Sequence, residues 1–278
     1  MSKIAANRIG VALWSIGIGA NEAEFAQVLD DAVKTGVKGV QPWIVDEPKW
    51  NTVCWLDPDR CNTSALRTKA RKMIESRGLK ISGFCSQLAG PTHLGGIGEE
   101  HADMEADIVK TEKALQLAVD IGTQVVTTHP GPIPEKTSDP VYQLMLRNLG
   151  RIAKAAEKCG AFFCIETGQE SAETLKKFLE TVGSPNLKVN FDPANMVRWG
   201  TVAAVKTLAK YIAHTHAKDI NESTGKATLG HGAVPWKEYL KALDEVGYKG
   251  WFAIEDETKD DKIKSISEGR EFLLNTKY

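Results

Sequence analysis

Short apolar runs alternate with longer amphipathic stretches along the whole sequence. Eight runs rich in β-branched and aromatic residues have the length and composition of buried strands: 9–16, 39–43, 80–85, 124–128, 162–165, 188–191, 211–216 and 251–254. Eight stretches with apolar residues at helical spacing follow them: 22–34, 64–76, 105–120, 140–159, 171–182, 202–210, 235–246 and 263–274. This alternation predicts βα units and a parallel sheet.

Eight βα units in one chain favour closure into a barrel. The chain has 278 residues, and roughly 250 are typical of a (β/α)8 barrel. No linker, repeat array or low-complexity block divides it, and the segment after the first strand, Gly17-Ile18-Gly19, lacks the third glycine of a dinucleotide-binding fingerprint. We therefore expect a single α/β domain over residues 1–278 with the (β/α)8 TIM-barrel fold, not an open doubly wound sheet.

Composition argues against several classes of partner. The 35 basic and 36 acidic residues give a net charge of −1, and no Lys/Arg run offers a surface for nucleic acid or an anionic membrane. No stretch reaches the roughly 18 apolar residues of a membrane span. Five cysteines without a C-x-x-C pair fit a reducing compartment, and residues 10–20 read better as a first strand than as a signal peptide. We expect a cytoplasmic protein with a small-molecule partner.

Four predicted strands in the second half of the chain end in residues that can bind metals. These residues close apolar runs spaced by about one strand plus one crossover helix, and they are Glu166, Asp192, His216 and Glu255. In a barrel, the carboxyl ends of neighbouring strands converge on the central axis. We therefore expect the four side chains to meet at one end of the barrel, where barrel enzymes carry their chemistry.

Three carboxylates and one imidazole form a ligand set for a divalent cation. Mn²⁺ fits this oxygen-rich set best, and Mg²⁺, Co²⁺ and Zn²⁺ use the same ligand types. Each residue also has a structural interpretation on its own. Asp192 before Pro193 can begin a turn, His216 can be a core histidine, and either glutamate can be a solvated loop residue. Their shared position at four successive strand ends favours the metal site.

The segments around these residues closely resemble motifs of the xylose-isomerase-like barrel superfamily, in its sugar phosphate isomerase/epimerase branch: Ile165-Glu166-Thr167-Gly168, Val189-Asn190-Phe191-Asp192-Pro193-Ala194-Asn195, His214-Thr215-His216-Ala217-Lys218-Asp219 and Ala253-Ile254-Glu255. This branch contains ketose 3-epimerases, hydroxypyruvate isomerases, inosose dehydratases and isomerases, and dehydroshikimate dehydratases. The resemblance implies that Glu166 and Glu255 form the catalytic acid/base pair and that Asn195 contacts the substrate. It also implies the same four metal ligands, Glu166, Asp192, His216 and Glu255.

The chain departs from the family pattern after two of its strands. Gln41 stands at the end of the second strand, where relatives often carry a glutamate. His231 stands in the Leu-Gly-x-Gly stretch after the seventh strand, where relatives have a small or acidic residue, and it is a candidate contact for the substrate or the metal. Glu222 lies where some epimerases place an arginine.

Further residues at predicted strand ends are candidate substrate contacts. His129 ends the fourth strand and could shuttle a proton, or it could be a loop histidine. Lys218 lies two residues beyond His216 and could stabilise an oxyanion, or it could pair with an acidic neighbour. Trp14 and Trp43 lie at the ends of the first two strands and would pack against a sugar ring.

We expect a divalent-metal-dependent isomerase or epimerase of a sugar or sugar-like keto compound. The metal would stabilise an enediolate, one glutamate would remove a proton, and the other would return it. Expulsion of a hydroxyl from the same intermediate leaves an alternative, a metal-dependent dehydratase of a cyclic keto-sugar or cyclitol of the inosose dehydratase type. A nuclease of the same superfamily conflicts with the missing basic stripe, and a barrel without catalysis conflicts with the intact glutamate pair. A homo-oligomer remains open.

Overall fold

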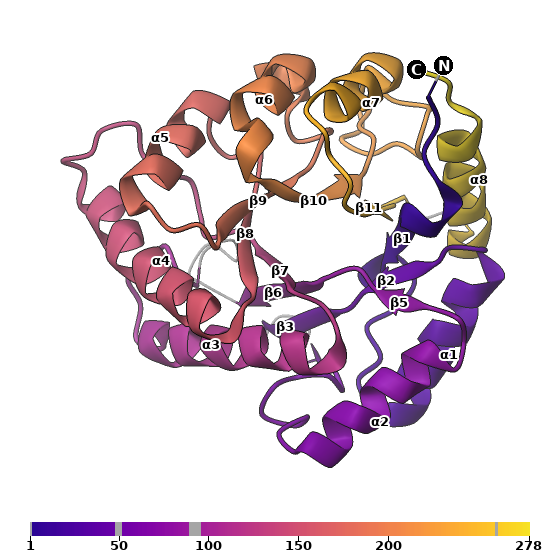
Figure 1. Ribbon diagram of the computed structural model, residues 1–278, viewed down its shortest axis with the longest axis horizontal. Coiled ribbons are helices and arrows are strands. Elements are labelled where there is room, and N and C mark those ends of the chain that lie inside the picture. The colour runs from indigo at the N-terminus through magenta and orange to yellow at the C-terminus, as the bar shows by residue number, and fades with distance from the viewer. Residues whose placement is uncertain (1, 48–51, 89–95, 259–260) are drawn as a thin grey trace.

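The computed structural model describes residues 2–47, 52–88, 96–258 and 261–278 (Figure 1). Within these residues the strands are β1 Ile9–Ala12, β2 Gly39–Gln41, β3 Trp43–Glu47, β4 Thr52–Val53, β5 Lys80–Ile81, β6 Phe84–Leu88, β7 Val125–Thr128, β8 Phe162–Glu166, β9 Leu187–Phe191, β10 Ile212–Ala217 and β11 Phe252–Ile254. The α-helices of the same residues are α1 Glu22–Lys34, α2 Ser64–Glu75, α3 Met104–Ile121, α4 Pro140–Cys159, α5 Ala172–Val182, α6 Thr201–Leu208, α7 Trp236–Glu245 and α8 Lys262–Asn275.

The parallel strands form a closed barrel, as predicted. β1 pairs with β2 and with β11, and the pairing continues from β11 through β10, β9, β8 and β7 to β6. β2 and β3 are two halves of one stave, interrupted at Pro42, whose nitrogen cannot donate a ladder hydrogen bond. β5 and β6 are the halves of the next stave. Because β2 pairs with β5 and β3 with β6, the ring closes, and Figure 1 shows the helices packed around it.

The first stave is shorter than the sequence predicts. β1 ends at Ala12, and Leu13–Ser15 form a short 3-10 helix, η2. Two successive backbone N–H groups donate to the carbonyl oxygen of Leu13 and close this turn. Trp14 therefore lies on a tight turn above the barrel, not at the end of a strand.

The helices bury one side against the barrel and expose the other. In α4, Leu149 and Ile152 are buried, whereas Arg151 and Lys154 are exposed. Asp139 caps the start of this helix, because its side chain accepts a hydrogen bond from the backbone N–H of Val141 at 2.8 Å. The bounds of α4 match the predicted ones. Across the described residues, none of the helices combines the length and the apolar character that a membrane span needs.

The barrel interior holds polar side chains near the carboxyl ends of the strands, whereas the layer between strands and helices is apolar. The space between strands and helices holds apolar side chains, among them Phe25 and Phe178, which are fully buried. Inside the barrel, Gln41, Asn190 and His214 are also fully buried, each at 0% exposure. Buried polar groups need partners, and these three lie directly beneath the strand ends that carry the predicted ligands.

Candidate metal centre

Four side chains from four neighbouring strands meet at the carboxyl end of the barrel. Glu166 is the last residue of β8, and His216 lies in β10. Asp192 and Glu255 directly follow β9 and β11. One ligand atom from each residue lies within 4.8 Å of the others, and all four residues are buried. The structure thus brings together the four predicted metal ligands.

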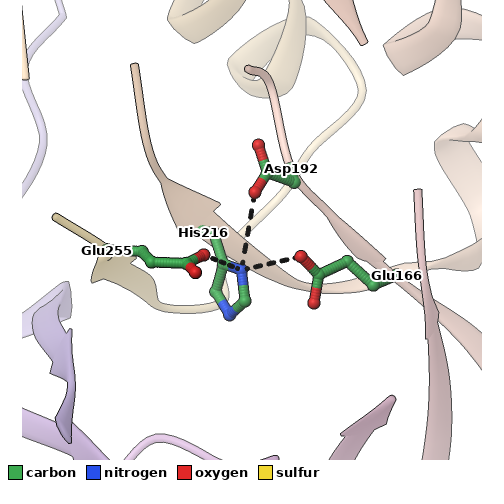
Figure 2. A group of neighbouring side chains, drawn as sticks. All are labelled: Glu166, Asp192, His216 and Glu255. Carbon is green, nitrogen blue, oxygen red and sulfur yellow. Dashed lines mark ion pairs between the residues drawn. The ribbon is translucent and has the colours of Figure 1, made fainter. Parts of the chain in front are cut away.

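The three carboxylates face the same nitrogen of the imidazole (Figure 2). His216 Nδ1 lies 2.9 Å from an oxygen of Glu255, 3.3 Å from one of Glu166 and 3.7 Å from one of Asp192. Figure 2 shows Glu166 and Glu255 on opposite sides of this nitrogen. A small molecule held at the cluster would therefore have one glutamate on each side.

Neighbouring groups fix one oxygen of each carboxylate. Asp192 Oδ1 accepts hydrogen bonds from the backbone N–H groups of Ala194 (2.8 Å) and Asn195 (3.1 Å), which leaves Oδ2 facing the cluster. Glu166 Oε2 accepts a hydrogen bond from Asn190 Nδ2 at 3.2 Å, which leaves Oε1 facing His216 Nδ1. The carboxylates are therefore held in position by the barrel itself.

Glu255 is fixed in the same way through Oε1, which accepts hydrogen bonds from Trp14 Nε1 (3.0 Å) and Lys218 Nζ (3.3 Å). Its Oε2 atom forms an ion pair with His216 Nδ1 at 2.9 Å. Asp192 Oδ2 lies farther from that nitrogen, at 3.7 Å, and is one of the buried side-chain atoms of the described residues that have no hydrogen-bond partner. Buried polar atoms without partners are rare and call for a group that completes the site. The converging oxygens and the imidazole nitrogen fit a divalent cation such as Mn²⁺ or Mg²⁺.

The charges of the cluster shift the pKa values of its members. Burial acts to lower the pKa of His216, but Glu166 and Glu255 outweigh burial and raise that pKa well above its usual value. Burial acts to raise the pKa of Glu255, but Lys218 and His216 lower it to about 2. Burial is likewise outweighed at Glu166, where His129 and His216 hold the pKa well below its usual range. Without a metal, a protonated His216 therefore offsets part of the negative charge of the carboxylates, and a bound dication would take the place of that proton.

A cavity of about 390 Å³ lies over the cluster. Its lining includes both glutamates and four of the predicted substrate contacts, Trp14, Trp43, His129 and Lys218. The rings of Trp14 and Trp43 lie 5.8 Å apart, centre to centre, and are tilted by 58°. They form an apolar wall beside a polar floor, the combination that a sugar with apolar C–H faces and polar hydroxyls requires.

The polar candidates each contact one of the two glutamates. His129 Nε2 lies 3.2 Å from Glu166 Oε1. Lys218 Nζ lies 3.3 Å from Glu255 Oε1 and also pairs with the carboxylate of Glu257 at 3.1 Å. His129 thus belongs to the β8 side of the site and Lys218 to the β11 side.

Asn195 and His231 differ in their relation to the site. Asn195 Nδ2 donates hydrogen bonds to the carbonyl oxygen of Thr167 (3.2 Å) and, more weakly, to Glu166 Oε1 (3.5 Å), so it adjoins the cluster. His231 is exposed in the segment between β10 and α7, and it is not among the residues that line the cavity. The structure does not bring His231 to the site.

Two buried amides beneath the ligands were not predicted as site residues. Gln41 ends β2, and its side chain reaches His216 Nε2 at 3.0 Å. Asn190 lies in β9 and bonds both Glu166 and, at 2.8 Å through Oδ1, His214 Nδ1. Asn190 stands two residues before Asp192, so strand alternation places both on the same face of the sheet. The two-residue spacing from Asp192 could therefore have predicted that Asn190 lies near the site.

The fold and the buried cluster of carboxylates and imidazole together define the class of this protein: a β/α barrel with a candidate divalent-metal site at the carboxyl ends of its strands. The chain belongs to the xylose isomerase-like TIM barrel family, whose model matches residues 29–276. The family resemblance predicted from the four strand-end motifs is therefore confirmed.

Curated relatives match only part of their own lengths. A D-psicose 3-epimerase of Ruminiclostridium cellulolyticum is 28% identical over 127 residues, which are 41% of each chain. An uncharacterized protein of Methanocaldococcus jannaschii is 29% identical over 175 residues, 58% of this chain and 60% of its own. The chain thus spans between two fifths and three fifths of these relatives.

Solved structures match nearly the whole chain. A xylose isomerase domain protein from Planctomyces limnophilus is 26% identical, with a TM-score of 0.75, over 96% of this chain and 95% of its own. D-Psicose 3-epimerase from Clostridium cellulolyticum H10, solved with D-tagatose, has a TM-score of 0.72 at 17% identity, over 96% and 97%. A xylose isomerase-like barrel from Mycobacterium smegmatis, solved in complex with magnesium, has a TM-score of 0.72 at 17% identity, over 98% and 97%. The last two likenesses show the shared fold.

Proposed function

We propose that this protein is a divalent-metal-dependent isomerase or epimerase of a sugar or a sugar-like keto compound. The observation that carries the proposal is the placement of Glu166 and Glu255, buried and on opposite sides of one candidate metal site (Figure 2). An acid/base pair that faces a substrate from two sides can remove a proton from one face and return it to the other.

The comparisons support this class of reaction. One relative is a D-psicose 3-epimerase, and a solved neighbour of the same fold was crystallised with D-tagatose. Another neighbour holds magnesium. The donor set of this chain favours Mn²⁺ or Mg²⁺, and Co²⁺ and Zn²⁺ use the same ligand types. A bound dication would polarise the substrate carbonyl and stabilise negative charge on its oxygen.

The residues of the chain supply the proton transfers. One glutamate takes the proton from the carbon beside the carbonyl, and the electron pair moves onto the carbonyl oxygen to give an enediolate. Return of a proton by the other glutamate to the opposite face completes an epimerisation, and return to the adjacent carbon completes an isomerisation. His129, 3.2 Å from Glu166, can exchange the proton that this glutamate carries.

The remaining contacts position the substrate and its charge. Lys218 provides a cation beside Glu255, where it stabilises a developing oxyanion. Trp14 and Trp43 pack against the apolar face of the sugar. Asn195, which bonds Glu166, keeps that carboxylate directed into the site and contacts a substrate hydroxyl.

Proton exchange in D₂O tests the proposal. Purified protein loaded with Mn²⁺ is incubated with a panel of ketoses, keto-acids and inososes, and deuterium beside the carbonyl is measured by mass spectrometry and NMR. We expect incorporation for at least one substrate, and we expect Glu166→Gln and Glu255→Gln each to lower its turnover by about 10² to 10⁴-fold. Glu180→Gln, at an exposed glutamate of α5, is the matched control and keeps wild-type turnover.

Two results would contradict this function. Wild-type turnover in both glutamate variants would remove the acid/base pair from the mechanism. Formation of an unsaturated product with loss of water, without epimerised or isomerised sugar, would assign the site to the dehydratase alternative.

A further inference from the structure

We propose that Gln41 is a positioning residue that fixes the tautomer of His216. It holds the hydrogen of the imidazole on Nε2, so that the lone pair of Nδ1 is free to bind the metal. This role rests on the metal site of the proposed function.

The side-chain amide of Gln41 joins Thr127 to His216. Its Nε2 atom donates a hydrogen bond to Thr127 Oγ1 at 2.9 Å, and its Oε1 atom lies 3.0 Å from His216 Nε2. Both side chains that it joins are buried, at 0% exposure, on staves from the two halves of the chain. In this arrangement the amide nitrogen faces the Thr127 hydroxyl, and the amide oxygen faces the imidazole as a hydrogen-bond acceptor.

An acceptor at this position decides which imidazole nitrogen carries hydrogen. A neutral imidazole has one N–H and one nitrogen lone pair, and a metal takes the lone pair. The three carboxylates of the candidate metal site lie around Nδ1, so an imidazole that bound a metal there would carry its hydrogen on Nε2. Asn190 Nδ2 lies 3.2 Å from Nε2 and 3.3 Å from Nδ1, so it favours neither ring nitrogen, and an amide nitrogen donates and cannot accept. Gln41 Oε1 is therefore the acceptor that the described contacts offer to this buried N–H.

The neutral amide performs this task without adding charge. The cluster already holds three carboxylates, with Lys218 as a neighbouring cation. A glutamate at position 41 would accept the same hydrogen bond but would add a fourth negative charge to the buried interior, where charges are costly to bury unpaired. Glutamine keeps the acceptor and omits the charge.

Metal titration of Gln41 variants tests this role. Gln41→Met has a similar shape and lacks the acceptor, and Gln41→Glu retains it. We expect Gln41→Met to weaken Mn²⁺ binding, measured by electron paramagnetic resonance of free Mn²⁺, by about 10 to 100-fold, as outer partners of metal-bound histidines do. Gln41→Glu keeps an acceptor, and it is expected to bind Mn²⁺ more tightly than Gln41→Met does. Ser82→Ala, at another buried polar residue of the barrel, is the control for altered packing and keeps wild-type affinity.

The tautomer itself is read by NMR of protein labelled with ¹⁵N-histidine. We expect a hydrogen on His216 Nε2 of the Zn²⁺-loaded protein, hydrogen-bonded to Gln41 Oε1. Wild-type Mn²⁺ affinity in Gln41→Met, binding by Gln41→Glu no tighter than by Gln41→Met, or a hydrogen found on Nδ1 of the Zn²⁺-loaded protein would each overturn the role of Gln41. Neither readout uses a substrate. A protein that binds Mn²⁺ but exchanges no substrate proton would refute the proposed function alone.

Discussion

At the scale of single residues, the site is governed by competition between burial and charge. Each carboxylate of the cluster is nearly inaccessible to solvent, and burial by itself opposes ionisation. For Asp192, burial prevails and raises the pKa, although His216 and Lys218 act in the opposite direction. For Glu255, Lys218 and His216 prevail. A divalent cation would favour ionisation of all three carboxylates, so the arrangement is best satisfied when metal is bound.

Metal affinity is expected to rise with pH because His216 must lose a proton to become a ligand. Its pKa in the metal-free protein is raised well above the usual value by Glu166 and Glu255, which outweigh burial, so the protonated form dominates near neutrality. Below that pKa, one proton leaves for each cation bound, and affinity increases by about tenfold per pH unit. Calorimetric Mn²⁺ titrations between about pH 6 and about pH 8, in buffers of different ionisation enthalpy, measure both quantities.

A matched variant separates His216 from its neighbour in this experiment. His129 also has a raised pKa, because Glu166 outweighs burial there too. His129→Gln is expected to keep the pH slope. A slope that vanishes in this variant would assign the proton to His129, and an affinity that does not change with pH would contradict a protonated ligand in the metal-free protein.

At the scale of secondary-structure elements, the sequence predicts which elements form better than where they break. Apolar periodicity predicts α1 and α4 with their observed bounds, because caps and amphipathic spacing are local signals. The break at Pro42 follows from the missing N–H of proline, a local signal that the predicted strand 39–43 does not take into account, whereas no such signal marks the turn at Leu13–Ser15. Trp14 therefore reaches Glu255 from a turn and not from a strand.

The same distinction applies to the candidate site. Ligands at strand ends were predictable because parallel strands in a barrel deliver their carboxyl ends to one place. The support of Gln41 for His216 joins residues 175 positions apart, and the donation from Trp14 to Glu255 joins residues 241 positions apart. Such contacts depend on the directions of side chains inside the closed barrel. The sequence motifs do not predict them, and Gln41 stands out in the sequence only because a glutamate is absent at that position.

At the scale of the whole molecule, we propose that residues 1–278 fold as one domain. The ring closes only when the first strand, β1, pairs with the last, β11, so its stability depends on both ends of the described chain. Metal-free protein is expected to unfold in a single calorimetric transition whose van't Hoff and calorimetric enthalpies agree. Two separate transitions would show that part of the barrel folds independently.

The central claim is that the barrel gathers Glu166, Asp192, His216 and Glu255 around one divalent cation. Equilibrium titration with Mn²⁺, monitored by electron paramagnetic resonance, tests it most directly when wild type is compared with Asp192→Asn. This variant retains an acceptor for the N–H groups of Ala194 and Asn195 but loses the charge. We predict one Mn²⁺ per wild-type chain and an affinity at least about tenfold lower in the variant. Wild type without saturable binding, or equal binding by both proteins, would contradict the account.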